Sequence, residues 1–247
     1  MKKTLATLTI SLLAFPAISY AGDPPELTKE ARSAMNRRVM NDTFKYDAAK
    51  KCWKTDGTCL TLRYDHAQSD KVCETIYLRA SGPTKADYSD ATLHSLIVYQ
   101  PTRNGYRIVD KKKVITYTYG HDADAKYPFN RFLQFGPEHY GWMLVGLEHG
   151  SDGGATLATL YGLDSGHLRK LGAVSVAYAY QDEETNDNLK CVVDVDKGTQ
   201  PQDGYYPLTV TVSGTQKGKP MRTQVIKLPY DPAQKEYNQP DRFICGN

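Results

Sequence analysis

The sequence predicts a mainly β protein, with antiparallel strands arranged as a sandwich, a barrel or partial propeller-like sheets and a short N-terminal α-helix. Apolar and polar residues alternate with a period of two through much of the 247-residue chain. This alternation is the pattern of strands with one buried face. Turn residues recur about every ten positions, as they do in all-β folds. The regular strand–helix alternation of a parallel α/β fold is absent from the sequence.

The first 21 residues have the features of a secretory signal peptide. Lys2 and Lys3 precede an apolar run over positions 5–18, and Ser19 and Ala21 are the small residues before the expected cleavage site. The run is shorter than the roughly 20 apolar residues of a membrane-spanning helix. We therefore expect an exported protein, located in the periplasm of a Gram-negative bacterium, with no integral membrane segment after cleavage.

Residues 28–41 predict the helix, because Ala31, Met35 and Val39 recur at a spacing of four. Arginines between them make this helix basic. A basic amphipathic helix is able to touch an acidic partner, but we expect it to pack one face on its own domain.

Strands are predicted from residue 59 onward, and they divide the chain into parts. Asn104-Gly105 marks a tight hairpin turn, and a further turn is expected at positions 110–112. The predicted strands are residues 59–64, 72–78, 93–99, 106–109, 114–119, 140–147, 155–161, 167–171, 173–180, 189–195, 206–213 and 224–228. The parts are the signal peptide (1–21), a segment with the helix (22–50), a β-rich N-terminal part (51–126) and a β-rich C-terminal part (127–247), as one domain or two.

Net charge gives no general argument for nucleic acid or an anionic membrane as partner. The chain has 31 Lys and Arg against 28 Asp and Glu, and removal of Lys2 and Lys3 leaves 29 against 28, a net charge of +1. One local basic cluster is expected to be a solvated hairpin edge, where lysines also prevent edge pairing. Its members are Arg103, Arg107, Lys111, Lys112 and Lys113.

The five cysteines predict at most two internal disulfides in an oxidising compartment. They are Cys52, Cys59, Cys73, Cys191 and Cys245. We expect Cys52 to pair with Cys59, because an Asp-Gly turn lies between them. We expect Cys191 to pair with Cys245, which would tie the C-terminal tail to a strand. A zinc site is poorly supported, because no Cys-x-x-Cys motif occurs.

Strong catalytic motifs are missing from the sequence. It contains neither the Gly-x-Ser-x-Gly turn of a serine hydrolase nor a phosphate-binding loop, and no His-Glu-x-x-His motif. We therefore lean against an enzyme and expect no cofactor.

Six residues of the central stretch, 132–180, are the candidates for a binding or catalytic site. They are Glu138, His139, Glu148, His149, Asp152 and Asp164. The two Glu-His pairs flank one predicted strand and would lie about 30 Å apart, too far to share a metal ion. Paired carboxylates for glycoside cleavage must lie about 5–9 Å apart, a distance that the sequence leaves open.

Two acidic places have the composition of a weak calcium site. One is the loop 182–188, with Asp182 and Asp187, and the other is the Asp194-Val195-Asp196 segment. Neither has the spacing of a calcium-binding loop, so a solvated hairpin tip is the default expectation for the first.

The 18 tyrosines are the best positive indication of function. Tyrosine suits half-buried sheet faces and also binding surfaces. Packing explains most of them, and the rest predict a surface for a protein or glycan partner in the cell envelope. The leading hypothesis is a non-enzymatic binding protein with an inhibitor, immunity or accessory role. The alternatives are an envelope hydrolase acting on glycan or peptidoglycan through the central carboxylates, and a structural envelope component.

Overall fold

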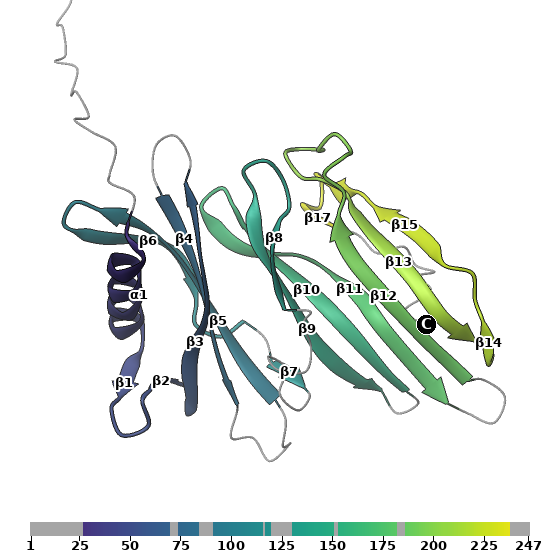
Figure 1. Ribbon diagram of the computed structural model, residues 1–247, viewed down its shortest axis with the longest axis horizontal. Helices are drawn as coiled ribbons and strands as arrows, with labels where there is room; N and C mark the ends of the chain where they lie inside the picture. Colours follow the sequence, from purple (N-terminus) through teal and green to yellow (C-terminus); the bar gives the residue numbers. More distant parts are fainter. Residues whose placement is uncertain are drawn as a thin grey trace, which may run out of the picture.

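The protein is described here by a computed structural model, in which the described residues are 27–69, 74–83, 91–115, 117–119, 130–150, 153–181 and 186–237. Of residues 91, 117–119, 147–150, 153–156, 177–181 and 186–187, only the backbone is described. The described chain is one helix followed by strands, so the predicted fold class is confirmed (Figure 1). None of its helices has the length and apolar character needed to cross a membrane.

The elements follow one another in chain order. They are α1 (Lys29–Thr43), β1 (Lys45–Asp47), β2 (Cys52–Thr55), β3 (Thr58–Ser69), β4 (Glu74–Pro83), β5 (Ala91–Thr102), β6 (Gly105–Lys112), β7 (Tyr117–Tyr119), β8 (Arg131–Gln134), β9 (Tyr140–Gly150), β10 (Gly153–Asp164), β11 (His167–Gln181), β12 (Asn186–Val195), β13 (Leu208–Gln216), β14 (Lys219–Pro220), β15 (Gln224–Leu228), β16 (Tyr230–Asp231) and β17 (Glu236–Tyr237).

Helix α1 forms where the sequence predicts it. The Thr28 side chain caps its first turn by accepting a hydrogen bond of 3.2 Å from the backbone N–H of Ala31. Val39 and Met40 are fully buried against the sheet, while the arginines at positions 37 and 38 stay exposed. The expectation that one face packs on the helix's own domain is therefore confirmed.

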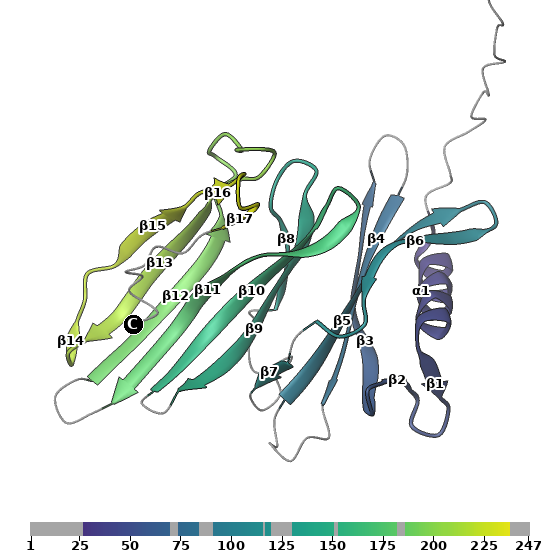
Figure 2. The ribbon, with the colours of Figure 1, turned by 180° about the vertical axis from the view of Figure 1, so that it is seen from behind.

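The strands form two antiparallel meanders, in which each strand pairs with its neighbour in the sequence. The first contains β1 to β6, and the second contains β9 to β13 with β15. Strand β7 joins them, because it pairs with both β5 and β9. Among the described residues β1 pairs only with β2, and β15 only with β13, so the ladder does not close into a barrel (Figures 1 and 2).

The two meanders pack face to face over a shared core. Tyr77, Leu96 and Val98 of β4 and β5 meet Trp142 and Leu144 of β9 in this core. The opposite face of β4 and β5 packs on α1. Every residue of β4 before Pro83 is therefore buried, unlike in a strand with one solvent face.

A third core lies on the other face of the second meander. It contains side chains of β9 to β13, and it is covered by residues of β15 to β17 and of the connections before β9 and β13. At one point Gly172 of β11 pairs in parallel with Tyr237 of β17. Gly172 has a φ of 133°, and a Cβ atom there would lie 2.6 Å from the Tyr237 carbonyl oxygen, so only glycine fits this contact.

One predicted turn and one predicted strand break are wrong, and one predicted turn is confirmed. Residues 110–112 belong to β6, whose Asp110 pairs with Val98 of β5. The predicted break between 171 and 173 is only an irregularity within β11, because the chain continues extended through Gly172. The hairpin near Asn104-Gly105 is confirmed, with Thr102 paired to Gly105.

Candidate binding surface

Four half-buried aromatic side chains gather where the two meanders meet, and we call them the aromatic rim. Tyr64 and His66 are two apart on β3, so they share one face of that strand. Phe132 lies on β8 and Tyr140 on β9. All four side chains are intermediate in exposure, so each keeps part of its surface in contact with solvent.

The rings of the rim contact one another across the two meanders. The ring centroid of Phe132 is 4.4 Å from that of His66, 5.6 Å from that of Tyr64 and 6.1 Å from that of Tyr140. The planes of Phe132 and Tyr140 differ by only 11°. These separations are typical of attractive aromatic pairs, so the rim holds β3 to β8 and β9.

Two buried rings support the rim. Tyr77 is the direct partner of His66 across β3 and β4, and Trp142 is the direct partner of Phe132 across β8 and β9. Phe132 meets both rings edge-on, with centroids 5.1 Å from Tyr77 and 5.6 Å from Trp142. Because Tyr77 and Trp142 are almost fully buried, the rim rests on a well-packed base.

Polar atoms orient the tyrosine at one end of the rim. The Tyr140 hydroxyl accepts a hydrogen bond of 3.0 Å from Nε2 of Gln134, and Oε1 of Gln134 accepts one of 2.7 Å from Nζ of Lys197. Burial raises the pKa of Tyr140 and also, together with the charge of Asp65, the pKa of Tyr64. Both hydroxyls therefore stay protonated at neutral pH and are able to donate and accept hydrogen bonds.

His66 is the titratable group of the rim. Burial lowers its pKa below the usual 6.5, and the nearby Arg32 charge acts in the same direction. A hydrogen bond with Gln68 and the charge of Asp65 act against this lowering. The imidazole is therefore neutral at neutral pH and presents one donor and one acceptor.

Two of the predicted site residues, His139 and Asp164, lie near one buried tyrosine. The His139 ring stacks on Tyr205, and Tyr205 stacks on Tyr230, with both centroid distances 4.0 Å. Burial raises the pKa of Tyr205, and the charge of Asp164 adds to the effect. The Asp164 carboxylate pairs with Arg169 at 3.0 Å. His139 and Asp164 thus take part in packing and ion pairing within the C-terminal half.

The structure does not bring the other predicted site residues together in one site within its described part. Glu138 is exposed in the connection between β8 and β9. The backbones of Glu148 and His149 pair with Ala155 and Gly154 of β10, and their side chains lie outside the described part of the chain. Asp152 lies outside the described residues altogether.

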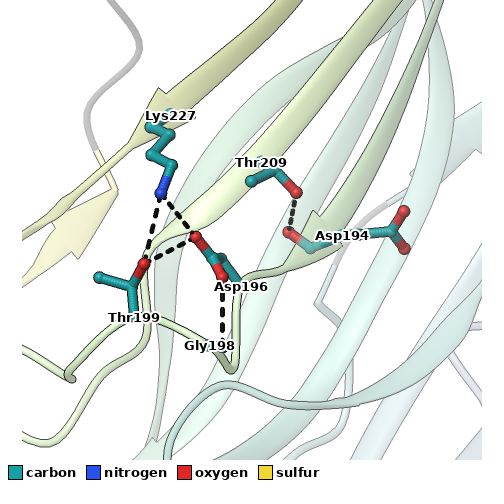
Figure 3. A network of polar contacts seen from close by, with 6 residues as sticks. All are labelled: Asp194, Asp196, Gly198, Thr199, Thr209 and Lys227. Atoms are coloured by element: carbon teal, nitrogen blue, oxygen red, sulfur yellow. Dashed lines mark hydrogen bonds and ion pairs between the residues drawn. The ribbon is translucent and has the colours of Figure 1, made fainter.

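Of the two acidic places, the one at Asp196 is fully described (Figure 3). The Asp196 carboxylate accepts hydrogen bonds of 2.9 Å from Nζ of Lys227, 2.8 Å from the Thr199 hydroxyl and 3.2 Å from the Gly198 N–H. Its pKa is lowered chiefly by the hydrogen bond with Lys227. Lys227 already neutralises the charge of the Asp196 carboxylate. The three hydrogen bonds therefore give Asp196 a structural role in its turn.

The remaining acids do not form a metal site within the described residues. Asp194 pairs with Arg131 at 3.0 Å. The carbonyl oxygen of Asp194 accepts a hydrogen bond from the Thr209 hydroxyl (Figure 3). Asp182 lies outside the described residues, and of Asp187 only the backbone is described. In the described part of the chain, no three His, Cys, Asp or Glu side chains group as metal ligands.

The predicted disulfide between Cys52 and Cys59 is confirmed, with Cα atoms 5.4 Å apart. It joins β2 to β3, whose residues Lys54 and Cys59 are direct partners. Cys191, in the core of the second meander, is also disulfide-bonded. Cys73 and Cys245 lie outside the described residues, so the pairing of Cys191 with Cys245 stays a prediction.

The aromatic rim has only a weak signal in the sequence. Tyr64-Asp65-His66 and Tyr140-Gly141-Trp142 each place two aromatic side chains on one strand face. The same spacing occurs in Tyr117-Thr118-Tyr119, so it does not single out a site. The rim depends on which faces meet, and that is decided by the packing of the two meanders.

The chain was compared with protein-family models, curated proteins and solved structures, and none of the three comparisons found a match.

Proposed function

We propose that this chain is an exported, non-enzymatic binding protein of the periplasm that holds a protein partner on the aromatic rim. An inhibitor, immunity or accessory protein acts in this way. The observation that carries the proposal is the half exposure of four aromatic rings on a buried aromatic base. Aromatic side chains held in place in the free protein lose little conformational entropy on binding, which favours affinity.

A protein partner fits the rim better than a glycan does. Sugar-binding platforms offer the free face of an aromatic ring, whereas the rings of Tyr64, His66 and Tyr140 all pack around Phe132. The half-exposed rings also carry two tyrosine hydroxyls and an imidazole, and such amphipathic groups are enriched at protein interfaces.

The test is capture from a cell-envelope extract followed by mass spectrometry, using the wild type and a Tyr64→Ser/Tyr140→Ser variant. We expect one protein at stoichiometric yield with the wild type and its loss with the variant. Val225→Ser is the matched control, because Val225 is also an exposed apolar residue but lies on β15, outside the rim. Thermal melts must first show that both variants fold like the wild type. If the rim variant then captures the same protein equally well, the rim is ruled out as the binding surface.

The hydrolase alternative gives a different result in the same extract. If no protein is captured, and the protein turns over peptidoglycan or glycan with a loss in Glu138→Ala or Glu148→Ala, the binding proposal is wrong. Retention of an oligosaccharide on the rim without turnover would assign the surface to a glycan instead of a protein.

A further inference from the structure

The near-zero net charge of the chain conceals an uneven distribution. Residues 27–115 contain 17 Lys and Arg against 10 Asp and Glu, a net charge of +7, whereas residues 116–247 contain 12 against 16, a net charge of −4. Among the described residues of 27–115, thirteen Lys and Arg side chains are exposed, against four Asp and Glu. The first meander and its helix therefore carry an excess of exposed positive charge.

Part of this positive charge is concentrated at the outer end of the molecule, where α1 lies beside the β1–β2 hairpin (Figures 1 and 2). We call the following six residues the basic end: Arg37, Arg38, Lys45, Lys50, Lys51 and Lys54. All six side chains are exposed.

Two neighbouring residues of α1 fix the hairpins on its two sides. Asn41 accepts a hydrogen bond of 2.8 Å from the indole N–H of Trp53, on the β1–β2 hairpin. Asp42 accepts one from the Tyr106 hydroxyl, on the β5–β6 hairpin. The Arg38 guanidinium lies over the Tyr106 ring, 5.8 Å from its centroid. The Cys52–Cys59 disulfide adds a covalent link to β3, so the basic end is held in place in the free protein.

One pair of positive charges in the basic end opposes folding. Lys45 and Lys54 are direct partners across β1 and β2, and like charges in this position repel each other. Asp47 relieves the repulsion only in part, through an ion pair of 2.6 Å with Lys54. Lys50 and Lys51 add two adjacent exposed charges at the turn. A sequence that keeps unfavourable local choices commonly does so at a functional surface.

An aromatic pair lies on the face of the hairpin opposite to Lys45 and Lys54. Tyr46 is 46% exposed, and it is the direct partner of Trp53, with ring centroids 5.4 Å apart. Arginine, tyrosine and tryptophan are the side chains that most often dominate protein–protein interfaces. Lysine and arginine steer an oppositely charged partner toward such a surface.

We infer that the basic end is a docking surface for an acidic protein, separate from the aromatic rim. Complementary charge brings the acidic surface to Lys45, Lys50 and Lys51. The inference does not depend on the proposed function, because the two surfaces share no residue.

The test measures binding of fluorescently labelled poly-L-glutamate by anisotropy, with the Lys45→Glu/Lys50→Glu variant and a matched control. We expect the variant to bind at least about tenfold more weakly than the wild type. The wild-type affinity should also fall steeply between about 50 and 300 mM salt, because exposed charges are screened. Lys170→Glu/Lys219→Glu is the control, because it reverses two exposed lysines of β11 and β14 and should bind like the wild type.

Misfolding cannot imitate the expected result. Lys45→Glu puts a negative charge directly opposite the positive charge of Lys54, which should stabilise the hairpin. Thermal melts of the variant check this. Equal weakening by the basic-end and control variants would overturn the inference. So would tighter binding of heparin, single-stranded DNA or phosphatidylglycerol vesicles than of poly-L-glutamate, since each of these results assigns the charge to another class of partner.

Discussion

The hydroxyl of Tyr99, on β5, donates a hydrogen bond of 2.6 Å to Oδ1 of Asn36, on α1. Both side chains are almost completely buried. Burial raises the pKa of Tyr99, so the hydroxyl remains a donor throughout the physiological range. The bond fixes the helix on the sheet within a core that is otherwise made largely of apolar side chains.

Tyr99→Phe should lower the free energy of unfolding by about 1–3 kcal/mol, because it leaves the buried Asn36 amide without this donor. Urea denaturation measures the change. In the Asn36→Ala/Tyr99→Phe double variant the loss should be smaller than the sum of the two single losses, since the bond is removed only once. Strictly additive losses would show that the bond does not link the helix to the sheet.

Loss of the Cys52–Cys59 disulfide should destabilise the protein by about 2 kcal/mol, as expected for closure of a short loop. Cys52→Ser/Cys59→Ser removes the bond, and thermal melting with and without a reductant measures the effect. A reductant should lower the melting temperature of the wild type more than that of the variant, in which only the disulfide of Cys191 is left to reduce. A variant as stable as the oxidised wild type would contradict the prediction.

Cys191 should be bonded to Cys245. Proteolysis without a reductant, followed by mass spectrometry, should recover a peptide pair that contains both residues and that separates on reduction. Recovery of Cys191 joined to Cys73 would overturn this pairing and leave Cys245 as the fifth, unpaired cysteine.

Acidification should weaken the packing of the two meanders through His66. Its pKa in the folded protein lies below the unfolded value near 6.5, so the unfolded state binds the proton more readily. Stability is therefore complete above about pH 7.5 and falls as the pH drops below about 6.5. Because His66 is only half-buried, the contribution should stay below about 1 kcal/mol.

Urea midpoints at neutral and mildly acidic pH test this prediction. His66→Gln should flatten the fall in stability between the two conditions, since glutamine does not titrate. An identical fall in the variant would assign the pH dependence to other groups.

Calcium, if it binds in the loop of Asp182 and Asp187, should raise the melting temperature, and Asp182→Ala/Asp187→Ala should abolish the increase. Asp196→Ala is the matched control, because Lys227 already occupies that carboxylate and the calcium response should be unchanged. A wild-type melt that is insensitive to calcium eliminates the loop as a calcium site.

The local features of the fold could be predicted from the sequence. Helix α1 follows from apolar residues spaced by four, and the strand at 224–228 follows from its alternation and flanking turns. Turns were harder to place. Asp110 and the lysines after it are polar enough for a turn, yet the ladder with β5 continues through them.

The candidate surface could not be predicted because it joins distant segments. His66 and Phe132 meet at 4.4 Å although they are far apart in the sequence. Their contact depends on the first meander turning one face to α1 and the other to β9, which no local pattern encodes. The stack of His139 on Tyr205 has the same origin, since it joins two connections that lie far apart along the chain.

The order of the strands in space follows their order along the chain within each meander. A polypeptide that emerges N-terminus first, from a ribosome or from a translocation channel, is thus able to add each new strand to the edge left by the one before it. Cys52 and Cys59 are only seven positions apart. Both therefore become available for oxidation before most of the strands have emerged. The topology therefore favours vectorial assembly. Each strand pairs with the one before it, so little apolar surface stays exposed to solvent until a segment distant in the sequence arrives.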